Sequence, residues 1–280
     1  MGNEDVIRLS FFFGVLIFMA IWELLRPRRV LTMSKLTRWS SNLGIVVLDN
    51  ALVRFLFPVL AISLALTGQQ NNWGLLNNIQ LPFVFSVGLG VLALDLVIYL
   101  QHVIFHTVPV FWRMHMMHHA DLDFDVTTGL RFHPLETIMS MLIKLAAVAA
   151  IGPSATAVLI FEVTLNATSM FNHSNVKMPF NADRGLRLLV VTPDMHRVHH
   201  SVTIRETNSN FGFNFPWWDR LFGTYRAQPA AGHEEMAIGL SQFRDAKKNS
   251  LLWMLALPFT GDPGYYAINR RGGEPVSRNR

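Results

Sequence analysis

Residues 82–119 give the clearest indication of the fold, and they read PFVFSVGLGVLALDLVIYLQ followed by HVIFHTVPVFWRMHMMHH. The first part is apolar and 20 residues long. At a rise of about 1.5 Å per residue, a helix of that length spans roughly 30 Å, the thickness of the hydrocarbon core of a bilayer. The second part carries five histidines. Together they predict a membrane-spanning helix that leads directly into a histidine cluster.

The composition of the whole chain agrees with a membrane protein. Apolar residues make up 51% of the 280 residues and charged residues 15%, whereas soluble domains carry about 25% charged residues. The net charge is +5, and the basic residues flank apolar runs instead of forming one face, so we expect no nucleic-acid partner. The chain contains no cysteine, which excludes disulfides, thiolate nucleophiles, cysteine-ligated zinc and Fe–S clusters.

Charge around the first apolar run, residues 9–25, predicts the orientation in the membrane. Glu4 and Asp5 precede the run, and five basic residues follow it: Arg26, Arg28, Arg29, Lys35 and Arg38. A cleavable signal peptide has its charges the other way round, so we expect an uncleaved anchor. The positive-inside rule places residues 26–42 in the cytoplasm and the N-terminus outside.

Further apolar runs extend this topology. Residues 43–67 are a second expected span, in which Asp49, Asn50 and Arg54 should face protein instead of lipid. The polar, uncharged residues 68–81 suit a short external loop. Residues 82–101 then return the chain to the cytoplasmic side.

Residues 135–151 and 154–171 form an apolar hairpin around Gly152 and Pro153, which is either membrane-spanning or re-entrant. In both cases the chain enters and leaves on one side, so all histidine clusters are expected on the cytoplasmic face. Residues 251–259 are too short to span and indicate an interfacial helix. The polar, basic tail 263–280 is expected to be flexible.

The spacing of the histidines predicts a metal site. Ten of the 11 histidines lie between residues 102 and 200. They include one HxxxH set and two HxxHH sets: His102 and His106; His115, His118 and His119; His196, His199 and His200. Residues three or four apart share a helix face, which lets a helix present several imidazoles to one ion. Eight such histidines, with His173 as a ninth, exceed the needs of one ion and indicate two.

Other residues near these sets are open to two interpretations. His133 is either a further ligand or a histidine at the start of a helix before Pro134, whereas His233, followed by two glutamates, is expected to be solvent-exposed. Four aspartates next to the sets could offset metal charge or orient the imidazoles, or they could cap helices and loops: Asp121, Asp123, Asp125 and Asp194. The chain has no Glu-x-x-His sequence of the kind that soluble di-iron bundles use.

These motifs resemble the fatty acid hydroxylase/sterol desaturase family. The resemblance covers roughly residues 80–226. It rests on the three histidine sets and on further sequences in between: Arg131-Phe-His133-Pro-x-Glu136, Asn172-His173-Ser-Asn175, Pro193-Asp194, Asn210-x-Gly212 and Trp218-Asp219-x-x-Phe222-Gly223. One departure is Lys177, which stands where some members have the second histidine of an HxxxH set after His173. His133 or a water would take that place.

The resemblance implies a membrane-bound oxygenase with two iron ions. Such an enzyme uses O2 to hydroxylate or desaturate a C–H bond of a bilayer lipid, whether fatty acyl, sterol-like or amino-acid lipid. The electrons come from a separate donor, either ferredoxin or cytochrome b5 with a reductase. The implied organisation is all-α: anchor helices over 1–81, a catalytic domain over 82–226 with a cytoplasmic histidine-rich cap holding the dimetal site, and an interfacial helix with a basic tail over 227–280.

Two other classes of function are possible from the residues alone. A bis-histidyl haem electron-transfer protein needs histidines on facing helices near the middle of the bilayer, whereas these lie at and beyond the ends of the spans. A metal transporter or non-catalytic metal binder needs ligands within the spans, which contain few charged groups, among them Asp49, Arg54, Asp95 and Glu162. Imidazole alone suits Fe, Zn and Cu. The aromatic run from Phe211 to Trp218 is either a packed cap at the membrane interface or a lid over the lipid entrance.

Overall fold

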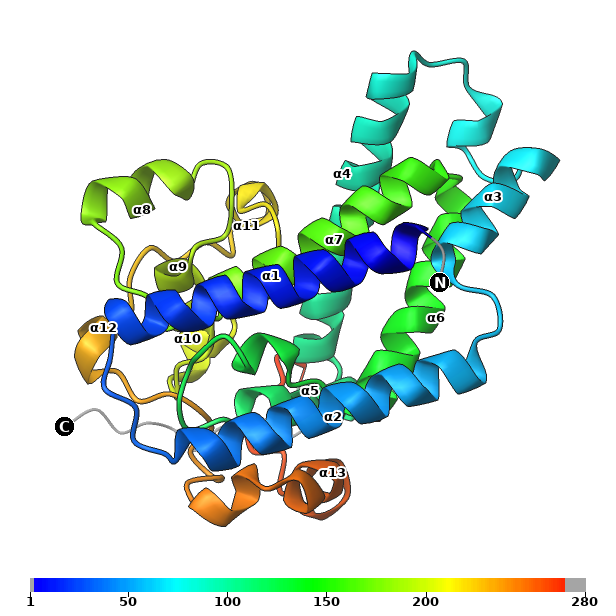
Figure 1. Ribbon diagram of the computed structural model, residues 1–280. Coiled ribbons are helices and arrows are strands. Elements are labelled where there is room, and N and C mark those ends of the chain that lie inside the picture. The colour runs from blue at the N-terminus through cyan, green and yellow to red at the C-terminus, as the bar shows by residue number, and fades with distance from the viewer. Residues whose placement is uncertain (1–2, 270–280) are drawn as a thin grey trace.

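A computed structural model describes residues 3–269 and shows an all-helical chain (Figure 1). Within these residues the only β-structure is two isolated bridges, Pro27–Val176 and Ser201–Ile238. The all-α prediction is therefore confirmed. The long helices are α1 (Asn3–Leu25), α2 (Lys35–Leu56), α4 (Phe83–Thr107), α6 (Pro134–Ile151) and α7 (Ala155–Asn172).

The long helices pack around α6 and α7. Helix α7 contacts α1 and α4, α6 contacts α2 and α4, and the shorter α3 (Ala61–Asn71) lies against both α6 and α7. A cluster of buried apolar side chains lies between α3, α4, α6 and α7, with Leu94, Val158 and Phe161 among them. Burial of these apolar side chains stabilises this part of the bundle, together with hydrogen bonds from Lys144 to Glu162 and from Gln101 to Ser140.

At one end of the bundle, two glycines bring two loops into close backbone contact. Gly74 and Gly152 both have left-handed backbones, with φ of +82° and +69°. A Cβ atom on Gly74 would lie 2.3 Å from the backbone nitrogen of Gly152. Only glycine tolerates both this conformation and this approach, so the loop before α4 packs directly onto the corner between α6 and α7.

The opposite end gathers the loop between α1 and α2, the residues after α4 and the residues after α7. The backbone nitrogen of Arg28 donates to the carbonyl of Asn175 at 2.8 Å, and that of Thr32 donates to the carboxylate of Asp123. Shorter helices build this end: α5 (Pro109–His119), η2 (Thr128–Leu130), α8 (Phe180–Leu186), α9 (Pro193–His199), α10 (Ile204–Thr207), α11 (Trp217–Leu221), α12 (Gly232–Glu235), η3 (Ala246–Asn249) and α13 (Leu251–Thr260). The last of these, the expected interfacial helix, packs on α5 and α2.

Four segments are long and apolar enough to cross a membrane: Glu4–Leu25, Lys35–Asn78, Phe83–Thr107 and Pro134–Ile151. The predicted hairpin is present as α6 and α7, joined by residues 152–154. These features support an integral membrane protein.

The predicted second span, 43–67, lies within the candidate span Lys35–Asn78, but it is interrupted and does not form one continuous helix. Helix α2 ends at Leu56 and α3 begins at Ala61, with Pro58 between them, because proline cannot continue the hydrogen-bond ladder of a helix. Helix α3 also extends to Asn71 and is followed by η1 (Leu76–Asn78), so residues 68–81 are not simply a loop.

The polar residues of α2 differ in their surroundings. Asp49 is buried and accepts a hydrogen bond from the Thr137 hydroxyl at 2.9 Å, as expected. Asn50 and Arg54 are exposed, which is contrary to expectation for Asn50, whereas the Arg54 guanidinium lies 4.0 Å from the Asp5 carboxylate of α1. The Asn50 side chain bonds to the carbonyl of Val46 in its own helix at 2.9 Å, which satisfies the amide without a neighbouring helix.

The expectation of a flexible tail is wrong for residues 263–269. Tyr266 is buried, and its ring stacks on Trp112 with the ring centroids 5.7 Å apart. The backbone nitrogen of Ile268 donates to the carbonyl of His106 at 2.8 Å. Residues 270–280, the rest of the predicted tail, lie outside the described residues.

Candidate metal centre

The histidines come from four helices that meet at one end of the bundle. The last two turns of α4 carry His102 and His106. A single residue, Val108, then connects α4 to α5, which begins with Pro109 at its first position and ends with His119. Proline is favoured there because its nitrogen has no hydrogen to leave unpaired. Helix α9 likewise starts with Pro193, after Thr192 as its N-cap, and His173 is the C-cap of α7.

Nine of the ten predicted ligands form two groups, all of them buried. Group one consists of His102, His106, His115, His119 and His199. Group two consists of His118, His173, His196 and His200. Within each group the candidate ligand nitrogens lie within 4.8 Å of one another. The groups adjoin, since the rings of His119 and His200 stack with centroids 4.5 Å apart.

Each HxxHH set is divided between the two groups. On α5, His115 and His119 join group one while His118 joins group two. On α9 the division is reversed, with His196 and His200 in group two and His199 in group one. Each of the two short helices therefore contributes histidines to both groups. Neither HxxHH set supplies all three of its histidines to one group.

The ring nitrogens of His118 and His173 face each other as two ligands of one metal ion would. Nδ1 of His118 lies 3.1 Å from the carbonyl of Arg131, and Nδ1 of His173 lies 2.8 Å from the carbonyl of Ser169. A carbonyl only accepts, so both Nδ1 atoms carry the proton and both Nε2 atoms present lone pairs. These two Nε2 atoms are 3.1 Å apart.

Protonation does not resolve this arrangement near neutral pH. Burial lowers the pKa of His118 well below its usual value and lowers the pKa of His173 to about 3. A metal ion does resolve it, because two nitrogens bound at about 2.1 Å and at right angles lie about 3 Å apart. The residues present therefore fit a bound metal ion.

The same contact recurs in both groups. The pairs His102–His115, His106–His119 and His173–His196 each bring two Nε2 atoms to 3.1 Å. In group one, Nδ1 of His102 faces the carbonyl of Phe211 at 2.8 Å. The geometry of the site is thus set by outer acceptors that fix which nitrogen points inwards.

Two side chains also serve as outer acceptors for candidate ligands. The sequence had not indicated this role for either of them. Oε1 of Glu136 lies 2.6 Å from Nδ1 of His115, and Oδ1 of Asn208 lies 3.1 Å from Nδ1 of His106. Glu136 is in the first turn of α6, three residues after His133. The feature of the sequence that could have identified Glu136 as a site residue is its place in the motif Arg131-Phe-His133-Pro-x-Glu136.

Of the three aspartates after the first HxxHH set, two bind arginine and the third binds backbone. Asp121 and Asp125 both accept from the buried Arg38 guanidinium, at 2.8 and 2.6 Å. Burial alone would raise the pKa of Asp121, but Arg38 and Arg131 lower it to about 2. Asp123 accepts from the backbone of Thr32. These carboxylates therefore fasten α2 and the preceding loop to the loop after α5.

Asp194 contacts two arginines. Its carboxylate pairs with Arg197 and lies 3.3 Å from Arg28. The N-cap of α9 is Thr192, whose hydroxyl accepts from the backbone of Met195, so Asp194 is not the cap. His233 lies 3.7 Å from Asp194 and is only 5% exposed, so the expectation of a solvent-exposed His233 is wrong.

His133 lies outside both groups. Its Nδ1 accepts from the backbone of Leu135 as the N-cap of α6, and its Nε2 lies 3.2 Å from the carbonyl of Leu255. The structure therefore places it in the helix-start role, one of the two interpretations open from the sequence.

Aromatic rings surround the histidines. Phe132 stacks on His118 with centroids 4.7 Å apart, Phe211 lies 5.1 Å from His106, and Phe213 lies 5.2 Å from His102. Phe215 and Trp217, further along the same run, stack on each other instead. In the aromatic run from Phe211 to Trp218, Phe211 and Phe213 therefore line the site, whereas Trp217 lies on the outer surface.

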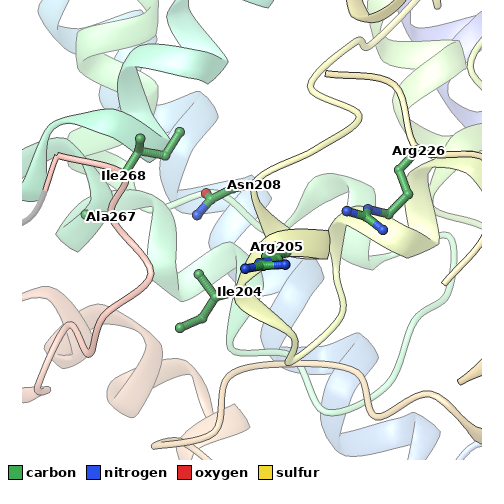
Figure 2. A pocket seen from close by; sticks show the side chains of 6 residues that line it. All are labelled: Ile204, Arg205, Asn208, Arg226, Ala267 and Ile268. Carbon is green, nitrogen blue, oxygen red and sulfur yellow. The ribbon is translucent and has the colours of Figure 1, made fainter. Parts of the chain in front are cut away.

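A cavity of about 390 Å³ lies next to group one. Figure 2 shows the residues that line it: Ile204, Arg205, Asn208, Arg226, Ala267 and Ile268. Asn208 connects it to the site, since the same side chain bonds His106. The cavity therefore approaches a candidate ligand from the outside of the histidine cluster.

An all-helical chain with four candidate spans and two buried histidine groups defines a membrane protein with a candidate polyhistidine metal centre. Residues 87–224 match the family model described as fatty acid hydroxylase, and all nine histidines of the two groups lie within them. Residues 87–224 are thus a fatty acid hydroxylase domain, and the resemblance seen in the motifs is confirmed.

Several curated proteins are similar to the chain over this domain. The ornithine lipid hydroxylase of Rhizobium tropici is 29% identical over 159 residues, 57% of this chain and 47% of that protein. Human alkylglycerol monooxygenase is 30% identical over 158 residues, 56% and 33% of the two chains. A very-long-chain aldehyde decarbonylase of Oryza sativa subsp. indica is 29% identical over 179 residues, 58% and 28%. The matches cover less than half of each relative, and no solved structure matches the chain significantly.

Proposed function

We propose that the protein is a membrane oxidoreductase that hydroxylates a C–H bond of a lipid, using O2, two iron ions and electrons from a separate protein. The observation that carries this proposal is the facing pair of Nε2 lone pairs on His118 and His173, 3.1 Å apart. The names of the relatives, a lipid hydroxylase and a lipid monooxygenase, favour hydroxylation over desaturation.

Groups one and two would each hold one ion. When bound, the ions would supply the activation of O2 that oxidation of an unactivated C–H bond needs. The protein's own contribution is to keep the imidazoles neutral and aimed inwards, through Glu136, Asn208 and three backbone carbonyls. Hydrogen-bonded acceptors of this kind fix the ring orientation and raise the basicity of the ligand.

The aromatic wall suits an apolar substrate. Phe132, Phe211 and Phe213 contact ligand rings on the inside of the site. They exclude water and favour an acyl or alkyl chain over a polar molecule. The proposed substrate is therefore a bilayer lipid, whether fatty acyl, sterol-like or amino-acid lipid.

The cavity beside His106 suits an acidic electron donor. Arg205 and Arg226 both line it, and neither has an ion pair with an acidic side chain among residues 3–269. A donor protein with an acidic surface, such as a ferredoxin or cytochrome b5, would complement these charges. Asn208 alone would then lie between the docked donor and His106 of group one. We further propose that this end of the bundle faces the cytoplasm.

The experiment compares membrane lipids from cells that express the wild-type chain, the His118→Ala variant or neither. A lipid that gains one oxygen only with the wild type, together with bound iron in the purified protein, supports the proposal. A loss of two hydrogens would instead identify a desaturase. Iron-free protein with an unchanged lipid profile would contradict both.

A further inference from the structure

An apolar surface is exposed on the histidine side of the bundle, outside the four candidate spans. Its side chains are between 39% and 69% exposed: Leu186, Leu188, Leu189, Trp217, Leu221 and Phe222. We call them the apolar surface. Soluble surfaces rarely expose so many large apolar side chains together, so such a patch indicates a partner.

Hydrogen bonds show that the apolar surface is continuous. The indole nitrogen of Trp217 donates to the carbonyl of Leu188 at 2.7 Å, and the Arg220 guanidinium donates to the carbonyl of Arg187 at 3.2 Å. The residues after α8 and those of α11 therefore lie side by side, as Figure 1 also shows.

Contacts with α4 place this surface at the level of a candidate span. The Trp218 indole donates to the Asp95 carboxylate at 2.7 Å, and the Phe222 ring stacks on Tyr99 with centroids 5.4 Å apart. Asp95 and Tyr99 lie twelve and eight residues before the end of α4 at Thr107. At about 1.5 Å per residue this is roughly 12–18 Å back along the helix. Helix α11 thus lies beside the span and not beyond it.

The charges at the rim of the surface suit lipid headgroups. Arg184 and Arg220 are exposed there, whereas the nearby Asp183 carboxylate is buried and paired with Arg187. Arginine side chains beside an apolar surface are typical of segments that lie in the membrane interface, with the guanidinium at the phosphates.

We propose that the apolar surface is inserted into the bilayer leaflet on the histidine side, with Arg184 and Arg220 at the lipid phosphates. The occupant of the surface is lipid, because the surface continues the lipid-exposed side of α4, where Leu89 and Leu100 are exposed. It is also joined to group one by contacting rings, from Phe222 to Tyr99, then to Phe211 and His102. This insertion does not depend on the proposed reaction.

The chain has no cysteine, so single cysteines can be labelled without further changes. The test variants are Leu189→Cys and Leu221→Cys. Leu89→Cys on α4 is the membrane control, and Glu235→Cys on the exposed side of α12 is the aqueous control. Each full-length variant is labelled with an environment-sensitive fluorophore and placed in vesicles of phosphatidylcholine and phosphatidylglycerol. Quenching by nitroxide-labelled lipid is compared with quenching by iodide.

We expect both test positions to be quenched by the labelled lipid as strongly as Leu89→Cys, and to be protected from iodide several-fold relative to Glu235→Cys. Iodide quenching equal to that of Glu235→Cys would overturn the proposal. Protection from both quenchers would overturn it too, because a protein partner or a second copy would then cover the surface. Gel filtration of each labelled variant confirms that it is folded, and two test positions guard against one local distortion.

Discussion

Nδ1 of the His115 ring lies 2.6 Å from Oε1 of Glu136, and both side chains are buried. The contact joins a candidate ligand on α5 to the first turn of α6, and Oε2 of Glu136 has no partner among the described residues. A carboxylate in this position holds the imidazole with Nε2 facing group one and makes that nitrogen a better ligand.

The Glu136→Gln variant should weaken metal binding while preserving the fold. The glutamine carbonyl still accepts from Nδ1, but glutamine cannot take up a negative charge when metal binds, so metal affinity should fall by about 10–100-fold. The measurement is competition with a chelator, with exposed Glu235→Gln as the matched control. Equal retention of metal by both variants would show that the charge of Glu136 has no influence on the site.

Loss of one ligand should remove the ion of one group only. His199 belongs to group one, so His199→Ala should lower the metal content by about one ion per chain and abolish lipid oxidation, while the protein still inserts into the membrane. His133→Asn is the control, since asparagine preserves the N-cap and the ring lies outside both groups. Metal loss in His133→Asn, or full activity in His199→Ala, would contradict the assignment of ligands.

The spacing of the histidines in the sequence predicted that these nine would cluster. It could not predict which of them belong to group one and which to group two. At about 100° per residue, His115 and His119 point about 40° apart, while His118 points roughly 60° to the other side of His115. Whether three such rings share an ion depends on the neighbouring helices, which local spacing does not encode. Burial of His233 and packing of Tyr266 depend on contacts with residues far away in the chain, and the polar residues around them suggested the opposite.

Asp194 was hypothesised from the sequence to orient a ligand or to offset metal charge, yet its carboxylate contacts Arg28 and Arg197. Asp194→Asn leaves the fully buried Arg197 without an ion partner, which should cost about 3–5 kcal/mol. Thr192→Ala, which removes the N-cap, should cost about 0.5–2 kcal/mol. We expect reduced yields of folded protein and an unchanged metal content per folded chain. Normal yield with lost metal in Asp194→Asn would instead support the original hypothesis.

Stability should depend on pH through His233. Burial lowers the pKa of His233 to about 4, against about 6.5 in an unfolded chain. Between these values the unfolded state binds the extra proton, so His233 contributes stability that is present above about pH 6.5 and lost as the pH falls towards 4. The loss is about 1.4 kcal/mol per pH unit within this window.

The comparison of wild type with His233→Gln isolates this contribution, because the ligand histidines are common to both. The unfolding midpoint of the wild type should fall more steeply than that of the variant between about pH 6.5 and pH 4. Parallel pH profiles would show that His233 is not the source.

The orientation of the protein in the membrane can be tested at the two ends of the bundle. Residue 75 lies beside the Gly74–Gly152 contact at one end, and residue 125 lies in the loop after α5 at the other. Five basic residues after the first span, against an uncharged loop at 68–81, predict that the histidine end faces the cytoplasm. A reporter fused after residue 75 should therefore be active only outside, and one after residue 125 only inside. The reverse result would place the Arg205 and Arg226 cavity on the side opposite to a cytoplasmic electron donor, and the proposed docking of such a donor would be wrong.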